Sequence, residues 1–248
     1  MKKGFYMSFR LKEFIVGLLA VIICTTCVFL LDFNKIINTT SEVELTQNVS
    51  SKVKIIIDPG HGEFDGGTQS ASGILEKDIN LKISLLLRKK LNSLGYEIIM
   101  TRDTDMVLSD VDADSTRQKK SSDLKNRLKV IEANPDAVFV SIHQNYFTQS
   151  QYSGTQVFYS KNNPDSMILA QTIQTQIAEN LQKENKRQIK PSGSEIFLLY
   201  KAQIPAVMVE CGFLSNVKET ELLTDDKYQK EIASEIAVAI DKYICNKG

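Results

Sequence analysis

Hydrophobic and polar positions divide residues 53–248 into short segments of two kinds. Residues 53–57 (VKIII) form a run of β-branched side chains, which predicts a buried strand. Residues 76–95 instead place isoleucine and leucine every three or four positions and end at Gly95, the pattern of an amphipathic helix with a glycine stop. The same alternation of strand-like and helix-like segments continues to the C-terminus.

The later segments follow from the same two patterns. Residues 103–120 are polar and irregular, and we expect a surface loop there. Helices are predicted at 121–134 (capped at Ser121 or Ser122), 163–185 and 225–245, and strands at 96–102, 136–143, 154–160, 195–200 and 204–210. Strands rich in valine and isoleucine that alternate with helices predict an α/β fold, a single layered domain with a mainly parallel, twisted sheet flanked by helices.

Residues 1–31 differ from the rest of the chain. Four basic residues and one acidic residue precede 18 uncharged, mostly apolar residues, 14–31. A basic flank before such a run predicts a signal peptide or signal anchor over 1–31. No clear Ala-x-Ala cleavage site follows, which favours an uncleaved anchor. The polar residues 32–52 are then a linker, and the domain at 53–248 is exported to the outer face of the membrane.

Charge and cysteine content narrow the classes of function. Beyond residue 31 the chain has 26 basic and 29 acidic residues, a net charge of −3, so nucleic acid is not an expected partner. Cys24 and Cys27 lie inside the apolar run and are interpreted as small apolar residues. Cys211 and Cys245 lie outside it, and the sequence leaves open whether they form a disulfide.

Four side chains with catalytic chemistry fall at one predicted edge of the sheet. The chain's two histidines, His61 and His143, follow or end strands, and Glu210 ends another. Glu76 begins the helix after the first strand, so it returns to the same edge. Ligands gather at the carboxyl ends of strands in open α/β sheets. We therefore expect these side chains to converge.

Two histidines and one carboxylate form an open catalytic zinc set, with a fourth position left for water. A second carboxylate, not bound to the metal, would act as general base. Each residue alone is weaker evidence for a metal site. Glu76, for example, could be an ordinary glutamate in the first turn of a helix, where the helix dipole favours a negative charge. Glu210 stands out more, since a carboxylate that ends an apolar strand is costly to bury without a purpose.

Five segments in order carry a resemblance to a known family. They are DPGHG (58–62), LEKD (75–78), TRDTD (101–105), NRLKVIEANPDAVFVSIHQN (126–145) and IPAVMVECGFLSN (204–216). Together they resemble the zinc-dependent N-acetylmuramoyl-L-alanine amidases of the amidase type 3 family, over about residues 53–245. The resemblance implies that His61, Glu76 and His143 bind Zn²⁺ and that Glu210 is the catalytic glutamate. Within the family, this chain is most similar to the short, spore-cortex (germination-specific) type, because its catalytic domain follows an N-terminal apolar segment directly.

Four further positions are weaker candidates for supporting the metal or binding substrate. Asp58 or Asn145 would hold the far nitrogen of a histidine ligand, as neighbouring groups of metal sites usually do. Glu63 stands where the family usually has glycine, and Gln144, between His143 and Asn145, stands where small residues are common in the family. We expect both near the metal, where they would tune the fit of the substrate. Arg187 lies in KRQIK, which resembles the family's R-x-x-K segment, although a solvated helix end would give the same pattern.

The resemblance implies a peptidoglycan hydrolase that cleaves the amide between the lactyl group of N-acetylmuramic acid and L-alanine. Its partners would be peptidoglycan, the membrane and a protein activator, and its location the outer membrane face, cell wall or spore cortex. One alternative is a zinc amidase or deacetylase acting on another wall amide. Another is a membrane-anchored wall-binding protein with a non-catalytic metal. Cys211 would be its fourth ligand, but strand alternation points Cys211 away from the face of Glu210.

Overall fold

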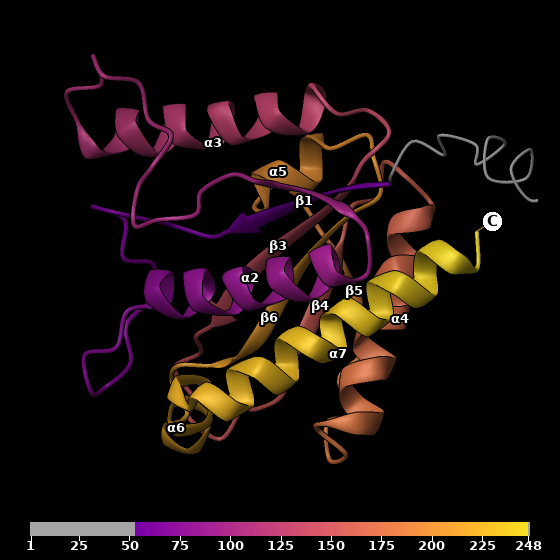
Figure 1. Ribbon diagram of the computed structural model, residues 1–248. Helices are drawn as coiled ribbons and strands as arrows, with labels where there is room; N and C mark the ends of the chain where they lie inside the picture. Colours follow the sequence, from indigo (N-terminus) through magenta and orange to yellow (C-terminus); the bar gives the residue numbers. More distant parts are fainter. Residues whose placement is uncertain (1–52, 248) are drawn as a thin grey trace, which may run out of the picture. The chain divides into compact units, whose positions relative to one another are not determined.

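A computed structural model describes residues 53–247. Its strands are β1 (Lys54–Pro59), β2 (Glu97–Met100), β3 (Val138–Asn145), β4 (Gln156–Tyr159), β5 (Lys190–Pro191) and β6 (Ala206–Phe213). Its helices are α2 (Glu76–Ser93), α3 (Thr116–Glu132), α4 (Asp165–Asn180), α5 (Phe197–Lys201), α6 (Val217–Thr224) and α7 (Asp226–Cys245) (Figure 1).

The strands form one six-stranded sheet in the order β2-β1-β3-β6-β4-β5. All neighbouring pairs are parallel except β4 and β6, which are antiparallel. The central strands β1, β3 and β6 are buried along nearly their whole length, because helices cover both faces of the sheet. The predicted α/β domain with a mainly parallel sheet is confirmed.

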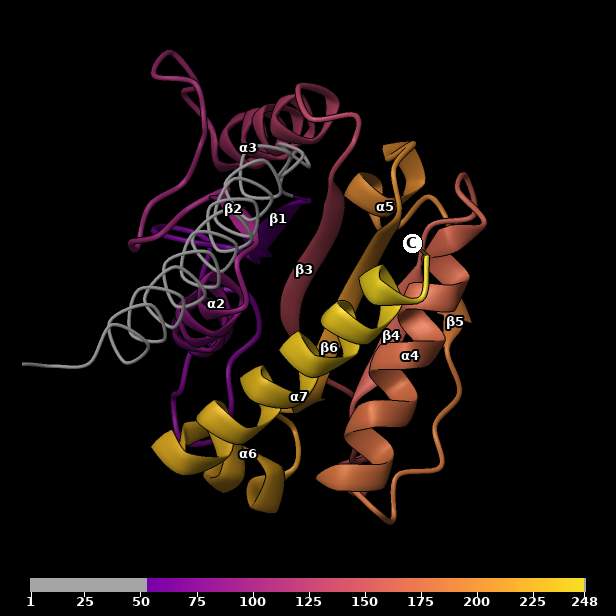
Figure 2. The same cartoon turned by 45° about the vertical axis from the view of Figure 1, so that its right-hand side comes forward.

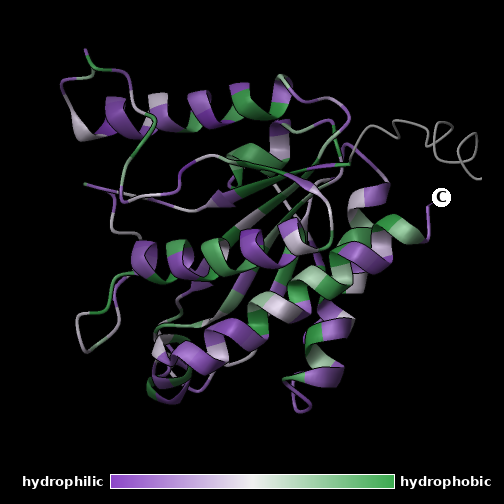
Figure 3. Cartoon of the chain, in the orientation of Figure 1, coloured by the Kyte–Doolittle hydropathy of each residue, from purple (hydrophilic) through white to green (hydrophobic). Residues whose placement is uncertain are grey.

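Helices cover the two faces of the sheet unequally. Helices α2, α4 and α7 pack on one face, and α3 and α5 lie on the other (Figures 1 and 2). On the first face the strands contribute the odd residues of β1 and the even residues of β3, such as Ile57 and Val140. The alternate residues of these strands, such as Ile56 and Phe139, point to the second face and form a smaller core there. Figure 3 shows green, hydrophobic strands between helices that each alternate green and purple. Burial of each such isoleucine stabilises the fold by roughly 1.5–3 kcal/mol.

The prediction of a strand over residues 195–200 is wrong. Helix α5 occupies this segment, and both Leu198 and Leu199 are buried. A strand would turn two consecutive side chains to opposite faces, whereas a helix that lies flat on the sheet can bury both. Leucine also favours helices over strands. The strand of this region is instead the two-residue β5.

Helix α3 begins earlier than predicted. Its N-cap is Ser115, not Ser121 or Ser122, and Gln118 completes a capping box with it. The signal S-x-x-Q was present in the sequence, inside the stretch interpreted as loop. Helix α6 was not predicted, although Asn216 caps it through the backbone N–H of Glu219.

Three predictions concern the chain ends and the cysteines. The predicted membrane segment at 1–31 and the linker at 32–52 lie outside the described residues. Over residues 53–247, no helix combines the length and the apolar character that spanning a membrane requires. Cys211 and Cys245 are both free thiols, the first buried and the second exposed, so the disulfide left open by the sequence does not form.

Candidate metal centre and catalytic site

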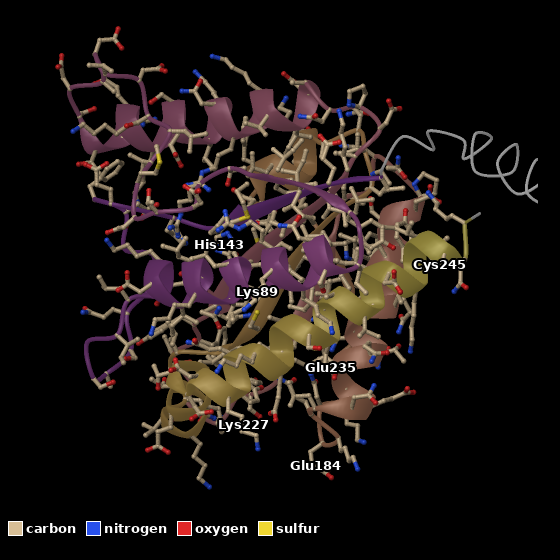
Figure 4. The ribbon with its side chains drawn as sticks, in the orientation of Figure 1. Lys89, His143, Glu184, Lys227, Glu235 and Cys245 are labelled. Atoms are coloured by element: carbon tan, nitrogen blue, oxygen red, sulfur yellow. The ribbon has the colours of Figure 1, made fainter. Side chains whose placement is uncertain are left out.

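The carboxyl ends of three neighbouring strands bring the candidate side chains together. His61 lies two residues beyond β1, and His143 and Glu210 are paired neighbours in β3 and β6. Paired residues of neighbouring strands project from the same face of a sheet, so these two side chains lie side by side. Glu76 is the first residue of α2, which returns to this edge; Figure 4 labels His143.

A carboxylate bridges the two histidines. Glu76 Oε1 lies 2.8 Å from His143 Nδ1, and Glu76 Oε2 lies 3.2 Å from His61 Nε2. One ligand atom from each residue can be chosen so that all three lie within 4.8 Å of one another. The imidazole rings meet edge to face, with centroids 5.0 Å apart. Three donor atoms therefore face one common point.

The surrounding polypeptide fixes the Glu76 carboxylate from the other side. It accepts hydrogen bonds from the backbone N–H groups of Thr68 (2.9 Å) and Gln144 (3.1 Å) and from the Asn80 amide (3.2 Å). Burial alone would raise the pKa of Glu76, but the two histidines hold it well below its usual range. The side chain of Gln144 turns away to Asn80. The backbone N–H of Gln144 therefore contacts the cluster, and its side chain points away from it.

Asp65 holds the far nitrogen of His61. Its carboxylate lies 2.9 Å from His61 Nδ1 and also pairs with Lys120 at 2.8 Å. With Nδ1 occupied, Nε2 is the nitrogen that faces Glu76. Burial by itself would lower the pKa of His61, yet Asp65 and Glu76 raise it to about 9. The site therefore stabilises positive charge beside His61, whether carried by a proton or by a metal ion.

Asp58 or Asn145 was predicted for this supporting role, but neither side chain forms a hydrogen bond with a histidine within residues 53–247. Asp58 is buried under the loop, where it pairs with Arg127 at 2.6 Å. Asn145 lines a neighbouring groove. Asp65 was missed because it reaches His61 through a tight turn, in which Gly62 and Asp65 form an isolated bridge.

Two buried arginines hold the loop that carries His61. Arg127 donates to the carbonyls of Pro59 (2.9 Å) and His61 (2.8 Å), and Arg102 donates to those of Pro59 and Gly60 (2.9 Å each). His61 itself has a φ of 62°, a left-handed conformation that is costly for a non-glycine residue. We infer that these donors stabilise the strained turn. Both arginines belong to segments that carry the family resemblance, Arg102 to residues 101–105 and Arg127 to residues 126–145, but the sequence did not indicate what they do.

Glycines allow the close packing of the ligands. A Cβ added at Gly60 would lie 2.2 Å from Cε1 and Nε2 of His143. At Gly67, whose φ is +69°, a Cβ would lie 2.5 Å from Glu76 Oε2 and 2.7 Å from His61 Cδ2. The metal-ligand side chains thus pack directly against the backbone of these two glycines, and a larger residue at either position would displace them.

Glu210 is the unpaired member of the group. Its Oε2 atom is buried and has no hydrogen-bond partner within the described residues. Burial raises the pKa of Glu210 to about 7, with nearby Glu76 adding to the effect and His143 opposing it. Cys211 is buried in the core of the opposite face, as strand alternation predicted, and is not a member of the cluster.

The donor set fits a zinc ion. Zinc binds imidazole nitrogen and carboxylate oxygen, and three protein ligands leave one position open. Over residues 53–247, no second group of three histidine, cysteine, aspartate or glutamate side chains lies close enough to share an ion. The unpaired Glu210 carboxylate beside the cluster also fits a site completed by a cation and water.

Two depressions adjoin this edge of the sheet. One, of about 310 Å³, includes His61 and His143 and is bounded by Lys120 and Phe197. The other, of about 270 Å³, starts at Asn145 and includes Arg187. Of the remaining weaker candidates, Glu63 is exposed at the surface, and its backbone forms hydrogen bonds with Asp105 and Lys77.

Comparison with known proteins gives consistent matches. Residues 55–242 match the family model described as N-acetylmuramoyl-L-alanine amidase. The germination-specific N-acetylmuramoyl-L-alanine amidase of Bacillus subtilis (strain 168) is 34% identical over 200 residues, which cover 81% of this chain and 83% of that protein.

Solved structures agree with this match. The CwlD amidase from Clostridioides difficile, solved in complex with the GerS lipoprotein, has a TM-score of 0.76 and 44% identity, and the match covers 79% of this chain and all of that one. An N-acetylmuramoyl-L-alanine amidase from Clostridium difficile 630 has a TM-score of 0.69 and 30% identity, covering 80% of this chain and all of that one.

Proposed function

The chain belongs to the N-acetylmuramoyl-L-alanine amidase family, and from this premise we propose that it hydrolyses peptidoglycan with zinc held by His61, Glu76 and His143. The bond cleaved is the amide between the lactyl group of N-acetylmuramic acid and L-alanine. One observation carries the proposal: the Glu210 side chain lies beside a cluster of two histidines and one carboxylate, and its buried Oε2 has no hydrogen-bond partner among residues 53–247.

The ligands would contribute to zinc binding in different ways. Glu76 supplies the negative charge, and its position is fixed by donors from three other residues. His61 presents Nε2 because Asp65 occupies Nδ1. Bound zinc supplies a Lewis acid that polarises a carbonyl group and lowers the pKa of a coordinated water toward ~7.

Glu210 moves the proton. Its carboxylate takes a proton from the attacking water and then delivers it to the departing nitrogen of L-alanine, so that the amide C–N bond breaks. A carboxylate placed beside the attacking water can accept its proton and later release it to the leaving group. A free Oε2 is available for this transfer because no other donor within the described residues occupies it.

Glu210→Gln tests this role. Glutamine keeps the shape but cannot accept the proton, so amidase activity should fall by about 10²–10⁴-fold while zinc content and thermal stability stay unchanged. Glu76→Gln should instead weaken zinc binding itself. Glu179→Gln controls for the substitution itself, because Glu179 is exposed near the C-terminal end of α4, away from the cluster.

If Glu210→Gln cleaves peptidoglycan at a rate near that of the wild type, the base lies elsewhere. The alternative of a wall-binding protein with a structural metal predicts no activity in any variant. A structural zinc site usually has four protein ligands, and the described residues bring three together.

We further propose a place and a partner for this activity. The matched Bacillus subtilis relative is named germination-specific, which supports action on spore cortex. The match to CwlD bound to the GerS lipoprotein supports a protein activator. Residues 1–31 would hold the domain at the outer membrane face. Fractionation tests this placement: the full-length chain should sediment with membranes, and a soluble product lacking residues 1–31 would show cleavage instead.

A further inference from the structure

The depression of about 270 Å³ that starts at Asn145 forms a groove next to the catalytic residues, and positively charged side chains line it. Its lining contains two cations and no carboxylate: Asn145, Phe147, Tyr152, Gln156, Phe158, Arg187, Lys190 and Phe213. Gln156 is the cross-strand partner of Glu210, and Asn145 follows His143 by two residues. The groove therefore leads away from the point where the amide is cleaved.

Arg187 is held firmly in this groove. Its Nε donates to the carbonyl of Ser153 (2.7 Å), and its Nη1 donates to Gln156 Oε1 (3.3 Å). The guanidinium lies 4.5 Å from the ring centroid of Phe213 and 5.7 Å from that of Tyr152. Stacking on aromatic rings orients the planar group, and Nη2 makes no hydrogen bond within residues 53–247. Helix α4 ends at Asn180, so residues 186–190 lie beyond the helix, and Arg187 is half-buried.

Lys190 supplies the second cation. It is paired with Phe158 across β4 and β5, so its side chain projects from the same face as Phe158 and Gln156. Lys190 is exposed and forms no ion pair with another described residue. The buried Glu219 carboxylate is the acid that acts on Arg187 electrostatically, and its oxygens already accept from two backbone N–H groups.

These charges decide which half of the substrate enters the groove. The glycan chain presents hydroxyl and acetamido groups, which are uncharged, whereas the stem peptide carries carboxylates. Its second residue, D-glutamate, is linked through the side chain and leaves the α-carboxylate free.

We propose that Arg187 and Lys190 bind the free α-carboxylate of the second stem-peptide residue. This inference rests on the proposed amidase function and adds the specificity of its peptide side. An arginine whose free edge faces a groove can bind a carboxylate through charge-assisted hydrogen bonds, and a neighbouring lysine adds attraction without a fixed geometry. An α-amide at the same position could still accept a hydrogen bond through its oxygen but would lose the attraction between opposite charges.

Two substrates of equal glycan length test the inference. One carries L-alanyl-D-glutamate and the other L-alanyl-D-isoglutamine, in which the α-carboxylate is an amide. We expect the full-length wild-type protein to show a KM about tenfold lower for the acid, as for one charge-assisted hydrogen bond. Lys190→Gln should raise KM for the acid by part of this factor, because Arg187 remains, and it should leave KM for the amide and kcat for both substrates unchanged.

Controls separate charge from structure. Lys186→Gln removes a nearby exposed lysine that does not line the groove, and it should change neither KM. Arg187→Lys keeps the charge and should retain part of the preference that Arg187→Gln loses. The inference is overturned if Lys190→Gln and Arg187→Gln still distinguish the two substrates as the wild type does, or if the wild type cleaves both with equal KM. A wild type that cleaves neither would refute the amidase function itself.

Discussion

The packing of His143 against Gly60 gives a prediction with a magnitude set by geometry. In Gly60→Ala the new Cβ would lie 2.2 Å from the imidazole, while ordinary contact begins at 3.4 Å. The ring must therefore retreat by 3.4 − 2.2 = 1.2 Å, or the loop must move by as much. Metal–ligand distances tolerate only about 0.2 Å. We expect zinc affinity to fall by at least about 100-fold, the upper end of the loss caused by removing a group that only supports a ligand.

Chelator competition on the purified protein measures this loss, and circular dichroism checks that the fold survives. Gly66→Ala is the matched control, because Gly66 lies in the same loop and its nearest neighbour would be a methyl group of Leu75 at 3.2 Å, which can rotate away. That variant should bind zinc as the wild type does. Unchanged zinc affinity in Gly60→Ala would refute the reasoning, since His143 could then move 1.2 Å without loss of the ion.

Three further outcomes follow from the contacts around the site. Asp65→Asn should weaken zinc binding about 10–100-fold, measured by the same competition; equal affinity would mean that Asp65 does not orient His61. Arg127→Met leaves the Asp58 carboxylate buried without its charged partner and should lower the free energy of unfolding by about 3–5 kcal/mol, measured in urea; a loss under about 1 kcal/mol would contradict the ion pair's role. Burial alone would raise the pKa of Asp58, but Arg127 and two hydroxyl donors hold it below its usual value. The stability that this provides is present above about pH 3.9 and is lost as the pH falls through the lower folded-state pKa, so wild type and Arg127→Met should converge in stability in acid.

The central features of the site were predictable because they depend on strand ends. His61, His143 and Glu210 each follow or close an apolar run, and parallel strands bring such positions to one edge. Glu76 returned to that edge because a helix begins there. These placements need only the periodicity of the chain and the topology of an α/β sheet.

The supporting residues depend on backbone geometry that periodicity does not encode. Asp65 reaches His61 only because residue 61 adopts a left-handed φ of 62°, which closes a tight turn. Arg102 and Arg127 lie more than 40 residues from the loop they bind, and only the folded sheet places them beneath it. The segment 195–200 was misread because an apolar run of this length suits a strand or a short helix equally.

The most direct test of the account is to digest purified peptidoglycan with the full-length protein, with and without a zinc chelator, and to identify the new chemical ends. The account predicts new N-terminal L-alanine and intact glycan chains, with release abolished by the chelator and restored by added zinc. New N-terminal alanine at an undiminished rate in the presence of chelator would contradict the metal-dependent mechanism. New sugar reducing ends or free acetate, without N-terminal alanine, would contradict the assigned bond.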